Sequence, residues 1–304
     1  MKIINVGPRA KKYIFTAFKI IVSMVILYFL SRKLDFESIL ETYIRFSRSV
    51  LLIIFLTAVL KLIIEILNWA LYLRLNPAYR GKLPEILRSH LIGHAFRFLI
   101  PGGHATLGKI YFVQNDKISG AIAVFIEKFY QTWVYFLFAA FSAVFFFPKF
   151  SLFPKLMLFF IITWLPVLLY FTKIFIKKST YKPYYRKYLK IIPLVSGLQI
   201  LYMMITVFQY YLLLNNIQRI NFFASLQAVS LLQFANVIPI TYSGLGLRES
   251  FAVKTLPVFG ISAELAVATS LVVFLINSVV PALSGVFILT FTSKNNQESD
   301  SGCH

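Results

Sequence analysis

Two stretches of the chain share one pattern: IPGGHATLG at Ile100–Gly108 and IPITYSGLG at Ile238–Gly246. In each stretch, a proline is followed seven residues later by the glycine of a Leu-Gly pair. The likeness continues downstream, because Ile118–Val124 and Ile261–Val267 both begin with Ile-Ser and end with Ala-Val. The sequence therefore predicts that two halves of one protein carry the same interrupted apolar segment.

The composition of the chain predicts a membrane protein. Hydrophobic residues make up 59% of the 304 positions and charged residues only 14%, which excludes a soluble globular domain. The net charge of +20 comes from basic residues in short tracts between apolar runs, so we attribute it to contact with a bilayer and expect no nucleic-acid partner. Cys303 is the only cysteine, which excludes a disulfide framework and a thiolate metal site.

Six apolar runs approach the roughly 20 residues that a helix needs to cross a bilayer. They are Tyr13–Leu30, Val50–Leu73, Ile118–Phe147, Phe153–Ile176, Ile191–Leu214 and Ile261–Phe291. Two further apolar segments, Leu83–Phe112 and Phe222–Pro257, are broken near their middles by the shared pattern. Each half is too short to cross alone, so each segment is a re-entrant helix pair or two kinked short spans. We expect an all-α polytopic membrane protein with about six transmembrane helices and two re-entrant hairpins.

Lysine and arginine in the connections predict the orientation. Basic clusters at Lys2–Lys12 and Lys177–Lys190 both fall inside if the N terminus is cytoplasmic. An odd number of spans, three, separates the two broken segments, so they enter the membrane from opposite faces. We therefore predict one membrane domain over residues 1–291, built as an inverted repeat of about 13–147 and 153–291. Residues 292–304 are polar and are predicted to be a disordered cytoplasmic tail. The expected location is the plasma membrane.

The two turns of the shared pattern are candidate headgroup-binding elements. Non-helical backbone is tolerated at membrane depth only where protein or a wet cavity supplies hydrogen-bond partners. Glycine there permits a close approach or a positive φ, and the half-helices after the turns direct amide groups toward an anion. The alternative is that proline and glycine merely kink packed helices, but the matched pair favours binding. The residues concerned are Pro101, Gly102, Gly103, Gly108, Pro239, Gly244 and Gly246.

A basic residue follows each turn. Lys109 follows the first, and Arg248 with Glu249 follows the second. The planar guanidinium of arginine at a half-helix N terminus suits a phosphate group, because it can hold two oxygens at once. The alternative is that Arg248 extends to the lipid headgroups and Glu249 caps the helix. Sequence spacing alone leaves both interpretations open.

Four charged residues lie within the predicted spans. Lys61 is eleven residues beyond Val50, about 16 Å into the bilayer at 1.5 Å per residue. Glu65 is four residues further on, so the two side chains share a helix face. Glu127 and Lys128 are similarly deep in the next span. Because a charge inside the membrane is costly, these residues mark either a polar path or ion pairs that hold helices together, and a polar path is our expectation.

Three histidines raise the question of a metal site. His90 and His94 share a helix face, and His104 lies in the first turn. No carboxylate of matching spacing is present beyond Glu85, and no recognised zinc pattern occurs. We therefore expect interfacial histidines, no metal and no cofactor. Motifs for a metal-bound sugar nucleotide, a nucleophile elbow or a P-loop are also missing, so an enzymatic activity is not indicated.

The second turn resembles a known family signature. Ile238-Pro239, the run from Ser243 to Glu249 (SGLGLRE) and the run from Gly260 to Glu264 are similar to the flippase-like transmembrane family that includes the membrane domain of lysylphosphatidylglycerol synthases. The resemblance covers most of the chain to Phe291. In the first copy, Lys109 stands where relatives commonly have an acidic residue. The aminoacyl-transferase domain of the synthases does not follow Phe291, so the resemblance does not imply lipid aminoacylation by this chain alone.

The resemblance implies a membrane domain that moves or admits a polar lipid between leaflets. We expect a lipid translocase that binds an anionic or polyprenyl-phosphate headgroup, with membrane lipids as its partners. The alternative is an enzyme or membrane subunit of glycolipid or cell-envelope lipid synthesis that works with a biosynthetic enzyme. A third possibility is a transporter of a water-soluble solute.

Overall fold

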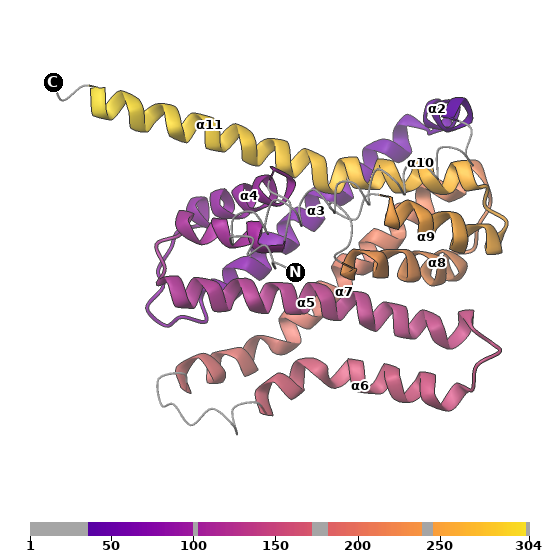
Figure 1. Cartoon of the computed structure of the whole chain (residues 1–304), viewed down its shortest axis with the longest axis horizontal. Coiled ribbons are helices and arrows are strands. Elements are labelled where there is room, and N and C mark those ends of the chain that lie inside the picture. The colour runs from indigo at the N-terminus through magenta and orange to yellow at the C-terminus, as the bar shows by residue number, and fades with distance from the viewer. Residues whose placement is uncertain (1–35, 100–102, 172–181, 239–245, 302–304) are drawn as a thin grey trace, which may run out of the picture.

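The computed structural model describes residues 36–99, 103–171, 182–238 and 246–301. Every regular element in these ranges is helical, and no strand occurs in them (Figure 1). The predicted all-α class is therefore confirmed. The predicted first span at Tyr13–Leu30 lies outside the described residues, as do Pro101, Gly102, Pro239 and Gly244 of the two turns.

Apart from α2, the longer described helices follow the predicted apolar segments. In chain order the helices are α2 (Phe36–Arg45), α3 (Arg48–Leu73), α4 (Leu83–Leu99), the 3₁₀ helix η1 (Gly103–Phe112), α5 (Lys117–Phe146), α6 (Leu152–Phe171), α7 (Lys182–Ile217), α8 (Phe222–Phe234), the 3₁₀ helix η4 (Ala235–Val237), α9 (Leu247–Thr255), the 3₁₀ helix η5 (Leu256–Phe259), α10 (Ala263–Phe274) and α11 (Val280–Ser301). A π-helical turn, Leu275–Val279, joins α10 to α11. Four segments of this part of the chain are long and apolar enough to cross a membrane: Arg48–Leu73, Lys117–Phe146, Arg186–Ile217 and Ala263–Thr290. They correspond to the second, third, fifth and sixth predicted spans.

Helices α3 and α7 run antiparallel with their ends in register. At one end, the backbone N–H of Ser47 donates a hydrogen bond to Asn216 Oδ1 at 2.9 Å. At the other, Lys187 Nζ donates to the carbonyl of Arg74 at 3.0 Å. The basic loop after α3 and the basic start of α7 therefore lie on the same side of the bundle.

The two broken segments lie in different parts of the bundle. In Figure 1, α4 lies at one end and α8 with α9 at the other, between the rod formed by α10 and α11 and the long helix α5. Helix α4 packs mainly on α11, and α8 packs mainly on α5. The close approach of α4 and α11 depends on Gly285, because a Cβ at this position would overlap the backbone carbonyl of Leu91. A small residue is thus required where these two helices cross.

Exposed apolar side chains define the lipid-facing surfaces. Helix α6 packs mainly on α5 and also contacts α7 at the edge of the bundle, and much of its surface is exposed Phe, Leu, Ile and Trp. The interior contains large aromatic side chains, among them Trp69, Tyr72, Tyr130 and Tyr210, all of which are fully buried. Three of them reach hydrogen-bond partners: Trp69 donates to Ser89, Tyr210 donates to Ser270, and the hydroxyls of Tyr130 and Tyr188 are 3.2 Å apart.

A tryptophan compensates for a proline inside α6. Pro166 has no N–H, so the carbonyl of Ile162, four residues earlier, loses its helical hydrogen bond. Trp133 of α5 donates its indole Nε1–H to that carbonyl at 2.8 Å. A carbonyl buried within the membrane has no water to donate a hydrogen bond to it. The bond from Trp133 therefore satisfies the Ile162 carbonyl and holds α6 against α5.

The side chain of Asp116 explains where α5 begins. Asp116 caps α5 by accepting hydrogen bonds from the backbone N–H and the hydroxyl of Ser119, and these bonds lower the pKa of its carboxyl group.

The last helix, α11, is helical to Ser301, although disorder was predicted from Thr292 onward. Extending an existing helix costs far less than nucleating one, which the polar composition of the tail did not reveal.

Candidate functional site: a charged pocket between α3, α4, η1 and α5

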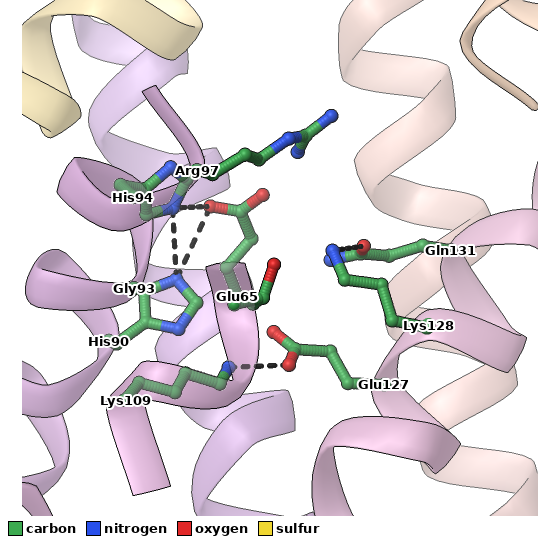
Figure 2. Close-up of a pocket in the computed structure, with 10 residues that line it drawn as sticks. Glu65, His90, Gly93, His94, Arg97, Lys109, Glu127, Lys128 and Gln131 are labelled. Atoms are coloured by element: carbon green, nitrogen blue, oxygen red, sulfur yellow. Dashed lines mark hydrogen bonds and ion pairs between the residues drawn. The ribbon is translucent and has the colours of Figure 1, made fainter. Parts of the chain in front are cut away.

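The structure gathers charged residues from four elements around one small pocket (Figure 2). The lining residues are Glu65 from α3; His90, Gly93, His94 and Arg97 from α4; Thr106 and Lys109 from η1; and Glu127, Lys128 and Gln131 from α5. The free volume is about 20 Å³, enough for one water molecule. Residues that the sequence assigned separately to the first turn and to an intramembrane polar path thus converge at one place.

Lys109 is the most deeply buried charge of the pocket. It is 1% exposed, forms an ion pair with Glu127, and lies over the ring of Trp69 with its Nζ 3.5 Å from the centroid. Gly93 makes room for it, because a Cβ on Gly93 would stand 2.9 Å from Lys109 Cδ. Gly108 is equally constrained, since its Cβ would clash with the ring of Phe96. Gly108 therefore packs closely against Phe96 of α4, and its role in headgroup binding stays a prediction.

Glu65 forms a cluster with the two histidines of α4. Its Oε2 lies 3.1 Å from His94 Nε2 and 3.5 Å from His90 Nε2, and the two histidine nitrogens are 3.2 Å apart. His90 is buried and His94 partly buried, so these side chains lie within the bundle and not at the interface that we expected. Their partner comes from a different helix, which is why no matching carboxylate appeared near them in the sequence.

Of the two lysines predicted for the polar path, Lys128 lines the pocket and Lys61 does not. Lys128 donates a hydrogen bond to Gln131 Oε1 at 3.0 Å, and both line the pocket. Lys61 does not line it; its Nζ lies 4.3 Å from the centroid of the Tyr202 ring. The ion pairs that the structure gives Glu65 are with the histidines, not with Lys61. Sharing a helix face was therefore insufficient to pair Lys61 with Glu65.

The second turn leads into a separate buried cluster. Gly246 adopts a φ of 81°, the positive value predicted for a turn glycine. Its N–H donates to Glu249 Oε2 at 2.7 Å, so Glu249 caps α9 as one of our two interpretations proposed. The other oxygen, Oε1, accepts from Arg248 Nη2 at 2.7 Å, and Arg248 Nε donates to Ser270 Oγ at 2.9 Å. Arg248 is 5% exposed, so it does not extend to the lipid headgroups.

Corresponding positions of the two halves bind the basic residue after each turn. Glu127 lies nine residues after Ile118, and Ser270 lies nine residues after Ile261. Glu127 pairs with Lys109, whereas Ser270 accepts from Arg248. The contact thus recurs at the same place on α5 and α10, although the chemistry has changed from an ion pair to a hydrogen bond.

These features define a polytopic α-helical membrane protein with a buried charged pocket beside a broken helix. The family model for the lysylphosphatidylglycerol synthase TM region matches residues 16–285, and the chain belongs to this family. The resemblance inferred from the second turn is confirmed. Membership associates the chain with the synthesis or modification of membrane lipids. No match was found among curated proteins.

Several residues of the pocket were missed by sequence reasoning. Arg97, Thr106 and Gln131 carry no motif, and only their position relative to other helices brings them together. One signal was present: Gln131 follows Glu127 by four residues, one helical turn, and so shares its face of α5.

Proposed function

We propose that this protein binds the anionic headgroup of a membrane lipid, an anionic phospholipid or a polyprenyl phosphate, and moves it between leaflets. The observation that carries the proposal is the charged pocket within the bundle. Its lining holds three cations, Arg97, Lys109 and Lys128, against two carboxylates, Glu65 and Glu127, which leaves a formal charge of +1 with neutral histidines. An excess of positive charge at membrane depth favours an anionic ligand.

The cations of the pocket differ in their availability to a headgroup. Lys109 is fully buried against Glu127 and Trp69. Its side chain is therefore held in place and contributes positive electrostatic potential to the pocket without contacting the headgroup. Arg97 is exposed and Lys128 is partly exposed. These two are the residues that we assign to direct contact with a lipid phosphate. Arg248, held by Glu249 and Ser270, positions the second turn in this proposal and does not bind phosphate itself.

The turns complete the proposed site through their backbone. Amide groups of the first turn would face the headgroup in one half and those of the second turn would do so in the other. The residues assigned to this role are Gly102, Gly103 and Gly108 of the first turn and Gly244 of the second. Pro101 and Pro239 have no N–H and shape the turns. Gly246, whose N–H is bonded to Glu249, shapes the second turn through its positive φ.

The antiparallel pairing of α3 and α7 supports an inverted repeat. Helix α4 follows the end of α3, and α8 follows the opposite-facing end of α7. The broken segments therefore start from opposite sides of the bundle. In the proposed mechanism, one half rocks against the other so that the headgroup is exposed to each leaflet in turn while the acyl chains stay in lipid.

The size of the pocket requires movement. A free volume of about 20 Å³ admits one water molecule but not a phosphate group. Binding a headgroup therefore requires α4 and η1 to separate from α5. In this proposal, the described conformation is a closed state of the cycle.

The proposed setting is the plasma membrane, with the N terminus and the C-terminal tail in the cytoplasm. Lys187 reaches the carbonyl of Arg74 at one end of the bundle, so the basic loop after α3 and the basic start of α7 share one side. An excess of lysine and arginine marks the cytoplasmic side of a membrane protein.

Lipids that copurify with the protein test headgroup binding. Mass spectrometry is applied to wild type, to the double variant Arg97→Gln/Lys128→Gln and to the control Arg186→Gln, whose exposed side chain lies outside the pocket. We expect one class of anionic lipid to be enriched in wild type and control and depleted at least 10-fold in the double variant. Equal lipid profiles in all three would refute headgroup binding at this pocket.

Family membership favours a second candidate function. The name of the family refers to a lipid-modifying synthase, so the same pocket is suited to presenting a lipid to a catalytic partner. This alternative predicts lipid binding without translocation. A reconstituted protein that enriches anionic lipid yet leaves its leaflet distribution unchanged would favour it over the translocase.

A further inference from the structure

We propose that Glu65, His90 and His94 bind one divalent transition-metal ion of the zinc class. The three ligand atoms are Glu65 Oε2, His90 Nε2 and His94 Nε2, and they all lie within 4.8 Å of one another. Their pairwise distances are 3.1, 3.2 and 3.5 Å. The proposal rests on this geometry and is independent of lipid translocation.

The spacing of the three atoms matches a tetrahedral metal site. Zinc binds histidine nitrogen and carboxylate oxygen at about 2.0–2.1 Å, which places neighbouring ligands of a tetrahedron about 3.3–3.4 Å apart. The observed distances lie within about 0.3 Å of these values. Only small side-chain movements are therefore needed to place an ion at the centre.

Two helices deliver the ligands in a fixed arrangement. His90 and His94 are four residues apart on α4, so both rings project from one face, and their centroids are 4.9 Å apart. This is also the spacing of the two histidines in helical zinc motifs. Glu65 reaches them from the middle part of α3. Two imidazoles and one carboxylate suit zinc, cobalt, nickel or copper, whereas magnesium and calcium favour all-oxygen ligands.

Protons alone do not satisfy the cluster. A neutral imidazole nitrogen carries either a hydrogen or a lone pair, so His94 Nε2 cannot both donate to Glu65 and accept from His90. At least one of the two contacts, His94 with Glu65 or His94 with His90, therefore lacks a good hydrogen bond. A cation at the centre accepts lone pairs from all three atoms at once.

All three ligand residues line the pocket, which offers room for a fourth ligand. Its free volume of about 20 Å³ admits one water molecule, as in metal sites with three protein ligands. Lys109 and Lys128 bring positive charge to the same pocket, and Glu127 offsets one of them. The remaining charge favours an anionic fourth ligand, such as hydroxide or a phosphate oxygen.

Zinc binding to the full chain tests the site directly. The protein is purified in detergent with a histidine-free affinity tag and titrated with Zn²⁺ against a chromophoric chelator. We expect wild type to bind one equivalent of zinc. Glu65→Gln and His94→Gln should each bind zinc at least about 100-fold more weakly, a larger loss than substitution of a residue that only hydrogen-bonds to a metal ligand causes. Glu85→Gln, on the same helix α4 but outside the cluster, should bind as wild type does.

Two readouts keep the test decisive if a variant is poorly folded. Zn²⁺ should raise the thermal midpoint of wild type and Glu85→Gln but not that of His94→Gln. Co²⁺ bound to wild type should give the intense visible absorption of a four-coordinate site. Less than one equivalent of zinc in wild type, equal affinity in all variants, or the pale spectrum of six-coordinate cobalt would each overturn the proposal.

Discussion

At the scale of single residues, each of the two basic side chains that follow the turns is buried beside a carboxylate. Lys109 pairs with Glu127 on another helix, and Arg248 pairs with its neighbour Glu249. Aromatic rings cover both cations, Trp69 in the first case and Phe274 in the second. Because removing one partner of a buried pair leaves the other charge without compensation, these positions are sensitive to single substitutions.

The first prediction concerns Glu249. Its carboxylate both caps α9 at Gly246 and neutralises Arg248, so Glu249→Ala leaves a buried guanidinium unpaired. We expect a loss of about 3–5 kcal/mol, seen as a lower thermal midpoint in detergent. Glu264→Ala, in the first turn of α10 and without an ion pair to any residue that the structure describes, is the control and should change little. Equal midpoints for the two variants would contradict this account of the pair.

The partner of a charged residue could be predicted from the sequence where the two residues are close together in the chain. Glu249 lies three residues after Gly246, so its capping role was visible in the spacing. Prediction failed where the partner comes from another helix. The spacing indicated only that Glu65 shares a helix face with Lys61, four residues away, whereas its ion pairs are with His90 and His94, because the arrangement of α3 and α4 decides which side chains meet.

At the scale of helices, packing depends on small residues and on compensation for lost backbone hydrogen bonds. Gly285 lets α11 approach the carbonyl of Leu91 on α4. Trp133 of α5 satisfies the carbonyl that Pro166 leaves open in α6. The sequence predicted the existence of these helices from their apolar length, but it contains no signal that pairs a particular glycine or tryptophan with a distant carbonyl.

The second prediction compares two glycines in helices. Gly285→Ala places a methyl group against the Leu91 carbonyl, so the two helices must separate at a cost of about 1–3 kcal/mol. Gly197→Ala places a methyl group where no atom lies within 4 Å, and it should stabilise α7 by about 0.4–1 kcal/mol. Thermal unfolding in detergent measures both. A destabilised Gly197→Ala or an unaffected Gly285→Ala would show that the described helix packing is incorrect.

The third prediction is a double-mutant cycle on Trp133 and Pro166. Trp133→Phe removes the donor to the Ile162 carbonyl and should cost about 1–3 kcal/mol. Pro166→Ala restores a backbone N–H that can bond this carbonyl, so the tryptophan substitution should cost measurably less in that background. Additive effects of the two substitutions would mean that the indole does not serve the carbonyl freed by proline.

At the scale of the whole molecule, composition and the length of the apolar runs predicted the class and the four candidate spans of the described chain. The two re-entrant segments and the orientation from loop charge stay predictions. The matched ends of α3 and α7 agree with the opposite entry sides that were expected from counting spans. The pocket was not predictable, because it depends on how α3, α4, η1 and α5 pack together. Helix α11 also exceeds the prediction, since it continues to Ser301 through residues whose polarity suggested disorder.

The fourth prediction and the most direct test of the account is lipid movement by the purified protein. Proteoliposomes carry a headgroup-labelled anionic lipid, and a membrane-impermeant quencher reports how much label has changed leaflet. We expect wild type and Arg186→Gln to move the label faster than protein-free vesicles, and Arg97→Gln/Lys128→Gln to be slowed at least 10-fold. Wild type that moves no lipid, or a double variant as fast as wild type, would contradict the claim that this pocket carries a lipid headgroup across the membrane.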